Sequence, residues 1–140
     1  MNQSVSPQPI RLRLSPSVKA DLSIACIHGR VIDCKKVPVL ILALSPVSME
    51  ITTNLLLPVF GHYVLSFEFQ IEQVWLKQYG QVALRKKEDN LYRYHISFVP
   101  NESNRRMLTG LLNAYIRRTR PKHVEIHQLY SKLSRYDSIV

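Results

Sequence analysis

The sequence predicts a mainly β domain: a six- or seven-stranded antiparallel barrel with one or two α-helices at its C-terminal end. Three observations support this expectation. Between residues 17 and 99, apolar and polar residues alternate over several short segments, which is typical of half-buried strands. Turn-forming residues separate these segments. After Pro100 the apolar spacing becomes helical. The 140 residues suit a single domain, and 46% hydrophobic residues are enough for a core.

The first predicted strand runs from Val18 to Cys26, where apolar residues occupy every second position. His28-Gly29 fits a turn, and residues 30–36 fit a short second strand or part of its return. The apolar run from Val37 to Leu44 predicts a strand that is covered on both faces. Ser45-Pro46 ends this run.

Four further strands are expected, at Met49–Thr53, His62–Ile71, Val74–Arg85 and Leu91–Val99. The segment His62–Ile71 has the clearest alternation in the chain. An interruption is expected around Tyr79-Gly80, inside the segment that begins at Val74. Lys86–Asn90 is polar and contains Asp and Asn, which suit the tight turn of a hairpin.

A helix is predicted to begin after Asn101, which can cap it. Its expected apolar face consists of Met107, Leu108, Leu111, Leu112, Tyr115 and Ile116. Arginines near its end favour the helix dipole, and Pro121 stops it. A second helix is expected to follow, with Ile126, Leu129, Tyr130 and Leu133 on one face.

The chain ends and the cysteines predict a cytoplasmic protein. Residues 1–10 are mostly polar and proline-containing, as in a mobile arm, and lack the pattern of a signal peptide. The longest apolar stretch is shorter than the ~20 residues that a membrane-spanning helix needs. Cys26 and Cys34 are outside any CxxC pattern, so two free, buried thiols in a reducing compartment are expected.

Positive charge concentrates in the last quarter of the chain. The formal net charge is +9, and the segment from Arg105 to Arg135 alone carries a net +7. This asymmetry favours an anionic partner, such as a nucleotide, a nucleic acid, a membrane surface or an acidic protein face. The alternative is a solvated basic helix that keeps the protein soluble.

The sequence contains no catalytic motif, so we expect a binding protein and not an enzyme. Neither a P-loop, a GxGxxG turn nor a GxSxG elbow is present. His123 and His127 are four residues apart, but Glu125 does not directly follow the first histidine as in HExxH. Two histidines are also too few for a zinc site, so no metal is expected.

Aromatic residues in the predicted strands have two interpretations. The four residues concerned are Trp75, Tyr79, Tyr92 and Tyr94. They could stack on a nucleic-acid or nucleotide base, but aromatics in strands more often pack in the core or across strands. Core packing is therefore the favoured interpretation.

Three segments carry a resemblance to a known family: Leu42–Ile51 (LALSPVSMEI), Val64–Phe69 (VLSFEF) and Tyr92–Phe98 (YRYHISF) followed by a helix. In this order they resemble the PilZ family of bacterial cyclic di-GMP receptors. The first looks like the strand-turn-strand around the family's Asp/Asn-x-Ser-x-x-Gly motif. The resemblance implies a PilZ-like barrel over residues 11–118, preceded by the arm 1–10 and followed by a helical extension, 119–140.

The chain departs from the family at the residues that hold the ligand. Ala43 stands where Asp or Asn is expected, Ser45 matches, and Ser48 stands where Gly is expected. The family also has two arginines, four residues apart, before its first strand. This chain offers only Arg11 and Arg13, which we expect on the flexible arm beside that strand. Loss of several charge-assisted contacts, each worth about 1.5–3 kcal/mol, would weaken the ligand strongly.

The leading functional prediction is a PilZ-like domain in cyclic di-GMP-related signalling that acts as a protein-interaction adaptor, with weak or no nucleotide binding. If the family context holds, the partner protein belongs to motility, pilus or surface polysaccharide machinery. The expected docking surface for an anionic partner consists of Arg105, Arg106, Arg117, Arg118 and Arg120.

Two alternatives remain open. In the first, the chain is an atypical cyclic di-GMP receptor with a rearranged site of Arg11, Arg13 and Ser45, next to Ser48. In the second, the basic C-terminal helices bind nucleic acid, although no nucleic-acid motif accompanies their charge. Cyclic di-GMP is the candidate ligand, and no cofactor is expected.

Overall fold

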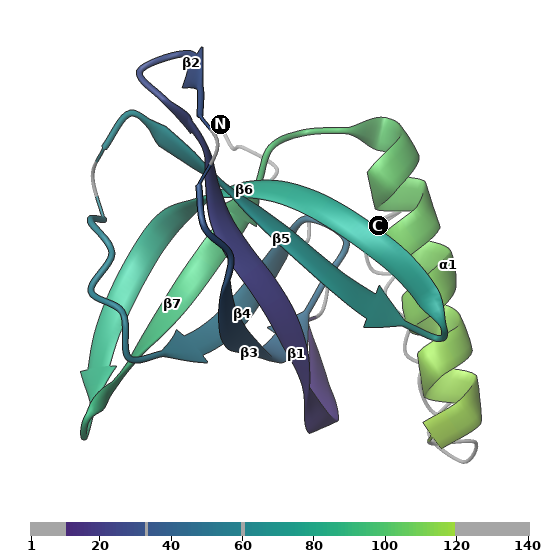
Figure 1. Cartoon of the computed structure of the whole chain (residues 1–140). Helices are drawn as coiled ribbons and strands as arrows, with labels where there is room; N and C mark the ends of the chain where they lie inside the picture. The colour runs from purple at the N-terminus through teal and green to yellow at the C-terminus, as the bar shows by residue number, and fades with distance from the viewer. Residues whose placement is uncertain (1–10, 33, 60, 120–140) are drawn as a thin grey trace, which may run out of the picture.

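The computed structural model describes residues 11–32, 34–59 and 61–119, which form an antiparallel barrel and one helix (Figure 1). The elements are β1 (Leu12–Ile27), β2 (Arg30–Val31), β3 (Val37–Leu44), β4 (Ser48–Thr53), β5 (Tyr63–Ile71), β6 (Val74–Glu88), β7 (Leu91–Phe98) and α1 (Glu102–Thr119). The predicted fold class is confirmed.

Closure of the sheet makes the barrel. The strands follow the order β2-β1-β3-β4-β7-β6-β5, and β1 also pairs with β5. Six strands therefore enclose the core, and the two-residue β2 pairs only with β1 at its edge. The helix α1 runs beside the barrel, close to the turn between β5 and β6 (Figure 1).

The core follows the alternation that the sequence predicts. On β5, for example, Leu65, Phe67, Phe69 and Ile71 are all buried. Tyr94 on β7 is buried as expected, and its hydroxyl donates to the Leu55 carbonyl at 2.6 Å and accepts from the Leu57 amide at 2.7 Å. These bonds fix the segment that connects β4 to β5.

Two strand boundaries differ from the prediction. β1 begins at Leu12, six residues before the predicted start, so Arg13 lies within a strand and not on a free arm. β6 runs without interruption through Tyr79-Gly80. At Gly80 a Cβ atom would lie 2.6 Å from Ile96 Cγ2, so the glycine permits close packing of β6 on β7. A glycine in a strand can mark such a close approach as well as a break.

Several burial predictions were wrong because a closed barrel hides only one face of each strand. Leu40 is exposed, so the segment Val37–Leu44 is not covered on both faces. Trp75 and Tyr79, expected in the core, are 68% and 41% exposed on the outer face of β6. The thiols of Cys26 and Cys34 are free as expected, but they are only partly buried, and Cys34 lies in the connection between β2 and β3 and not in a strand.

The predicted helix is present, with a narrower apolar face. Its cap is confirmed, since the Asn104 amide donates to Asn101 Oδ1 at 3.0 Å. Leu108 is buried together with two residues one and two turns later, whereas Met107 is 41% exposed. Arg120 and the second predicted helix lie outside the described residues. Within the described ranges, no helix is long and apolar enough to span a membrane.

Candidate functional site

The turn between β3 and β4 is held together by two buried serines. Ser45 Oγ accepts hydrogen bonds from the amides of Val47, at 3.2 Å, and Ser48, at 3.0 Å. It also lies 3.0 Å from Ser48 Oγ, and the Ser45 amide donates to the Ser48 carbonyl at 2.8 Å. The Ser45 hydroxyl thus closes the turn, in the way that serine commonly does in such turns.

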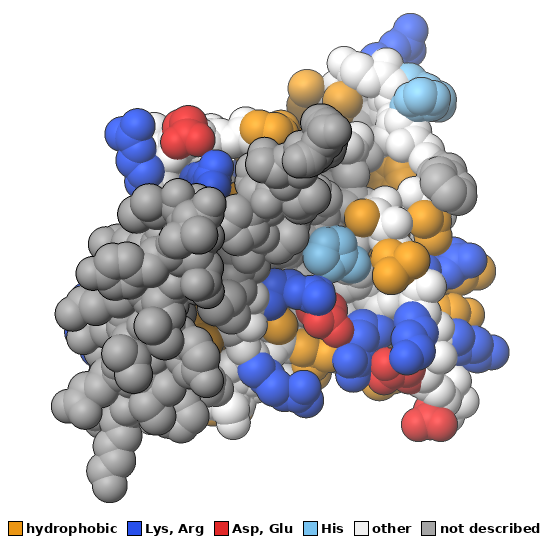
Figure 2. Space-filling view, turned by 180° about the vertical axis from the view of Figure 1, so that it is seen from behind, with side chains coloured by type: hydrophobic (Ala, Val, Ile, Leu, Met, Phe, Trp, Pro, Cys, Tyr) orange, Lys and Arg blue, Asp and Glu red, His pale blue; other side chains and the backbone are white. Residues whose placement is uncertain are grey.

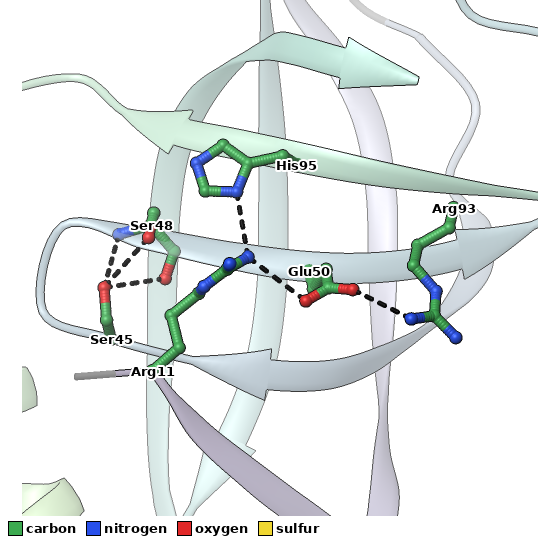
Figure 3. A network of polar contacts seen from close by, with 6 residues as sticks. All are labelled: Arg11, Ser45, Ser48, Glu50, Arg93 and His95. Atoms are coloured by element: carbon green, nitrogen blue, oxygen red, sulfur yellow. Dashed lines mark hydrogen bonds and ion pairs between the residues drawn. The ribbon is translucent and has the colours of Figure 1, made fainter. Parts of the chain in front are cut away.

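Arg11 points from the start of β1 across the outer surface of the barrel, past this turn (Figure 3). Its Nη1 atom donates to Glu50 Oε2 at 3.1 Å and lies 3.0 Å from His95 Nδ1. A guanidinium has donors only, so His95 Nδ1 must be the acceptor in this contact. The contact therefore requires the neutral form of the His95 ring.

Glu50 bridges two arginines. It lies on β4, opposite Ala43 of β3 on one side and His95 of β7 on the other. One carboxylate oxygen contacts Arg11, and the other accepts from Arg93 Nη1 at 3.2 Å. Arg93 also pairs with Glu88 at 3.1 Å. The result is a row of alternating charges across the outside of β4 and β7.

The environment of His95 favours its neutral form. Burial has the largest effect and lowers the pKa of the ring, and the nearby positive charge of Arg11 lowers this pKa further. The negative charge of Glu50 acts in the opposite direction. The net lowering agrees with the geometry, in which a protonated ring would face the Arg11 guanidinium at hydrogen-bond distance.

The structure brings together most of the residues predicted for the ligand site. Arg11 and Ser48 both line a cavity of about 620 Å³ beside the β3–β4 turn, and Ser45 lies within that turn. Arg13 sits in register with Ala43 on the neighbouring strand. Arg11 is not on a free arm, because Glu50 and His95 hold its side chain.

Glu50, Arg93 and His95 were not predicted from the sequence. Each stands at an outward-facing position in a strand, where a polar residue is ordinary. Only the register of β4 against β7 places these side chains together. Gln78, which also lines the cavity, was missed because it occupies an inward-facing position of β6.

The arginines of α1 are partly paired with acids. Arg118 Nε donates to both carboxylate oxygens of Glu72, at 2.9 and 3.1 Å, and Arg105 lies 3.7 Å from Glu102. Basic side chains on the back of the molecule also lie next to acidic ones (Figure 2).

Metal-binding geometry gives no candidate in the part of the chain that the structure describes. No group of three or more His, Cys, Asp or Glu side chains there could hold a metal ion. His123 and His127 lie outside the described residues.

Comparisons with known proteins identify the fold. No family model matches the sequence, and no curated protein matches it significantly. Among solved structures, the chain is similar to the PilZ domain of YcgR from Escherichia coli, determined with cyclic di-GMP. The TM-score is 0.61 over 84% of this chain and 96% of that chain, at 14% sequence identity. The chain therefore has a PilZ-like fold, as the sequence resemblance implied.

Proposed function

We propose that this chain is a non-enzymatic regulatory domain of cyclic di-GMP-related signalling that acts through a partner protein and binds the dinucleotide weakly or not at all. The fold supports the general role, since the similar domain of YcgR was determined with cyclic di-GMP. The internal hydrogen bonds and ion pairs around the β3–β4 turn support the more specific part of the proposal, that the dinucleotide binds weakly or not at all.

The observation that carries the proposal is the ion pair between Arg11 and Glu50. An anionic ligand that uses Nη1 of Arg11 must displace this carboxylate, which is held in turn by Arg93. The Ser45 hydroxyl is similarly engaged within its own turn. Each ligand contact would therefore replace an internal one, and the net gain per contact is small.

A calorimetric titration with cyclic di-GMP tests the proposal. We expect no saturable heat at micromolar protein, because Arg11 and the Ser45 hydroxyl are already paired. The double variant Arg11→Ala/Arg13→Ala should give the same result. Tight, stoichiometric binding to the wild type that disappears in the double variant would refute the adaptor proposal.

The second candidate is an atypical receptor, favoured by the cavity that Arg11 and Ser48 line. The double variant Ala43→Asp/Ser48→Gly restores the two family residues that the turn lacks, and it separates the two candidates. If the wild type binds weakly and this variant binds more tightly, the site beside the β3–β4 turn has kept its shape and lost only its polar contacts to the ligand. Measurable binding by the wild type that needs Arg11 would instead support the receptor.

A further inference from the structure

One outward-facing row of side chains on β6 has no part in the site described above. Trp75, Lys77 and Tyr79 stand at every second position of this strand, on the outer face of the barrel. Trp75 is 68% exposed and Tyr79 is 41% exposed, although aromatic side chains are on average well buried. None of the three lines the cavity beside the β3–β4 turn. They form a separate surface, here called the β6 row.

Strand pairing and a ring contact hold the β6 row in a fixed order. Each of its members pairs with a residue of β5, so the backbone beneath it is part of the sheet. Successive members are about 7 Å apart along the strand, because a strand rises by about 3.4 Å per residue. Lys77 Nζ lies 5.7 Å from the centroid of the Tyr79 ring, within the range of a cation–π contact. The row thus presents a ring, an ammonium group and a second ring.

The charge along β6 is positive as far as the hairpin. Between residues 74 and 87 the strand contains no acidic residue and four basic ones, which are Lys77, Arg85, Lys86 and Lys87. The ion pairs among the described residues involve none of the three lysines. Glu68 of β5 stands opposite Lys77, but its carboxylate is paired with Lys36 at 2.9 Å. Charge complementarity therefore favours an anionic partner.

The alternation of rings and a cation distinguishes between anionic partners. A single-stranded nucleic acid alternates bases with phosphates, and every base has a flat face that can stack on an aromatic side chain. In a duplex the bases already stack on one another, so they cannot use these rings. An anionic membrane would have to take up both rings together with the ammonium group between them, which is costly. An acidic protein face supplies negative charge but no regular series of rings.

We propose that the β6 row binds single-stranded nucleic acid, with bases stacked on Trp75 and Tyr79 and a phosphate beside Lys77. Lys86 and Lys87 continue the contact with the phosphates toward the β6–β7 hairpin. The inference goes beyond the adaptor proposal and does not depend on it. It also differs from binding through the basic C-terminal helices, because it rests on the exposed rings of the barrel.

The fluorescence of Trp75 provides the first test, because this residue is the only tryptophan of the chain. An oligothymidine of about 20 nucleotides, longer than one small barrel usually covers, should quench this fluorescence saturably at low salt. Three lysine–phosphate contacts should give a slope of about −2 for the logarithm of the association constant against that of the salt concentration, because each contact with a single strand contributes about −0.7. Duplex DNA of the same length should bind more weakly. Absence of saturable quenching, or equally tight binding of the duplex, would overturn the proposal.

Two variants test the stacking contact, measured by the fluorescence anisotropy of a labelled oligothymidine. Trp75→Ala should weaken binding about tenfold, because it removes one of the two rings. Leu84→Ala is the matched control on the same strand, since Leu84 is 64% exposed and has no ring. It should change the dissociation constant less than about twofold. Both side chains are mostly exposed, so neither variant should unfold the domain. Equal effects of the two substitutions would contradict stacking on Trp75.

A second pair of variants distinguishes the β6 row from the helix. Lys77→Gln and Arg106→Gln each remove one exposed positive charge, from β6 and from α1 respectively. Lys77→Gln should weaken binding several-fold, and Arg106→Gln should weaken it less. A larger effect of Arg106→Gln, together with no effect of Trp75→Ala, would place the nucleic acid on α1 and overturn the proposal.

Vesicles of phosphatidylserine and phosphatidylcholine test the membrane as the other occupant of this face. If these vesicles change the fluorescence of Trp75 and the oligothymidine does not, the proposal is wrong and the β6 row contacts lipid. Quenching by the oligothymidine alone is the expected result. The titration with cyclic di-GMP is a separate measurement, so either result here leaves the adaptor proposal unchanged.

Discussion

The polar network on the outside of the barrel depends on one residue, Glu50. Its carboxylate contacts Arg11 and Arg93, and it stands directly across from Ala43, where the PilZ motif places an acidic or amide residue. A carboxylate on the neighbouring strand thus lies across from position 43. It faces the arginines of the chain itself, and His95 completes the contact as a neutral acceptor.

The partly buried position of His95 predicts a pH dependence of stability. Its pKa is lowered from the ordinary value of 6.5, so between these two values the unfolded chain binds more protons than the folded one. The contribution of the neutral His95 ring to the free energy of unfolding is therefore fully present above its ordinary pKa. This contribution is lost as the pH falls toward the lowered pKa. We expect the urea midpoint of the wild type to be lower at about pH 5.5 than at about pH 7.5.

The variant His95→Gln isolates this effect from the other titrating groups. Glutamine offers Arg11 an acceptor oxygen and does not titrate, so the decrease between the two pH values should be smaller than in the wild type. An equal decrease in both proteins would show that other groups cause it.

At the scale of elements, α1 is docked on the barrel by a few specific contacts. Leu108 is fully buried, and the Tyr115 hydroxyl accepts from the Ser15 amide at 3.0 Å. The far end of the helix is tied to the β5–β6 turn by Arg118 and Glu72. Glu72 and its neighbour Gln73 both have positive φ angles, as in a two-residue hairpin turn of type I′. Neither residue is typical of that turn, so its geometry could not be predicted from the sequence.

Leu108→Ala should destabilise the domain by about 2–5 kcal/mol, because it removes a fully buried side chain and leaves a cavity. Met107→Ala is the matched control on the same helix turn, since Met107 is 41% exposed, and it should cost roughly 1 kcal/mol or less. Urea unfolding measures both. Similar losses for the two variants would contradict the packing of α1 described above.

Alanine substitutions at Gly80 and Gly110 are expected to change the stability of the domain in opposite directions. A methyl group at Gly80 would collide with Ile96 and lie 3.0 Å from the Ser97 carbonyl, so Gly80→Ala should cost about 1–3 kcal/mol. Gly110 has open space around it within α1, so Gly110→Ala should stabilise by about 0.5–1 kcal/mol. Thermal unfolding measures whether each variant is less stable or more stable than the wild type. A neutral Gly80→Ala would mean that β6 and β7 pack less closely than the structure indicates.

At the scale of the whole molecule, the sequence predicted the features that depend on the local spacing of apolar and polar residues. The alternation in β5 and the helical spacing after Asn101 were enough to give the strands, the capped helix and the fold class. The side-chain contacts that depend on the register between paired strands could not be predicted. The pairing of β4 with β7 places Glu50 beside His95, and no spacing along the chain indicates it. Exposure of Trp75 was missed for a related reason, since alternation does not say which of two apolar faces points inward.

We propose that Arg11 and the Ser45 hydroxyl are satisfied internally in this PilZ-like fold, and that Glu50 occupies the position of an anionic ligand. The most direct test compares the affinity of cyclic di-GMP for the wild type and for Glu50→Gln by calorimetry. We expect no saturable binding to the wild type at micromolar protein, and stronger binding to Glu50→Gln, where Arg11 is released from its ion pair. Tight binding to the wild type that Glu50→Gln leaves unchanged would contradict it.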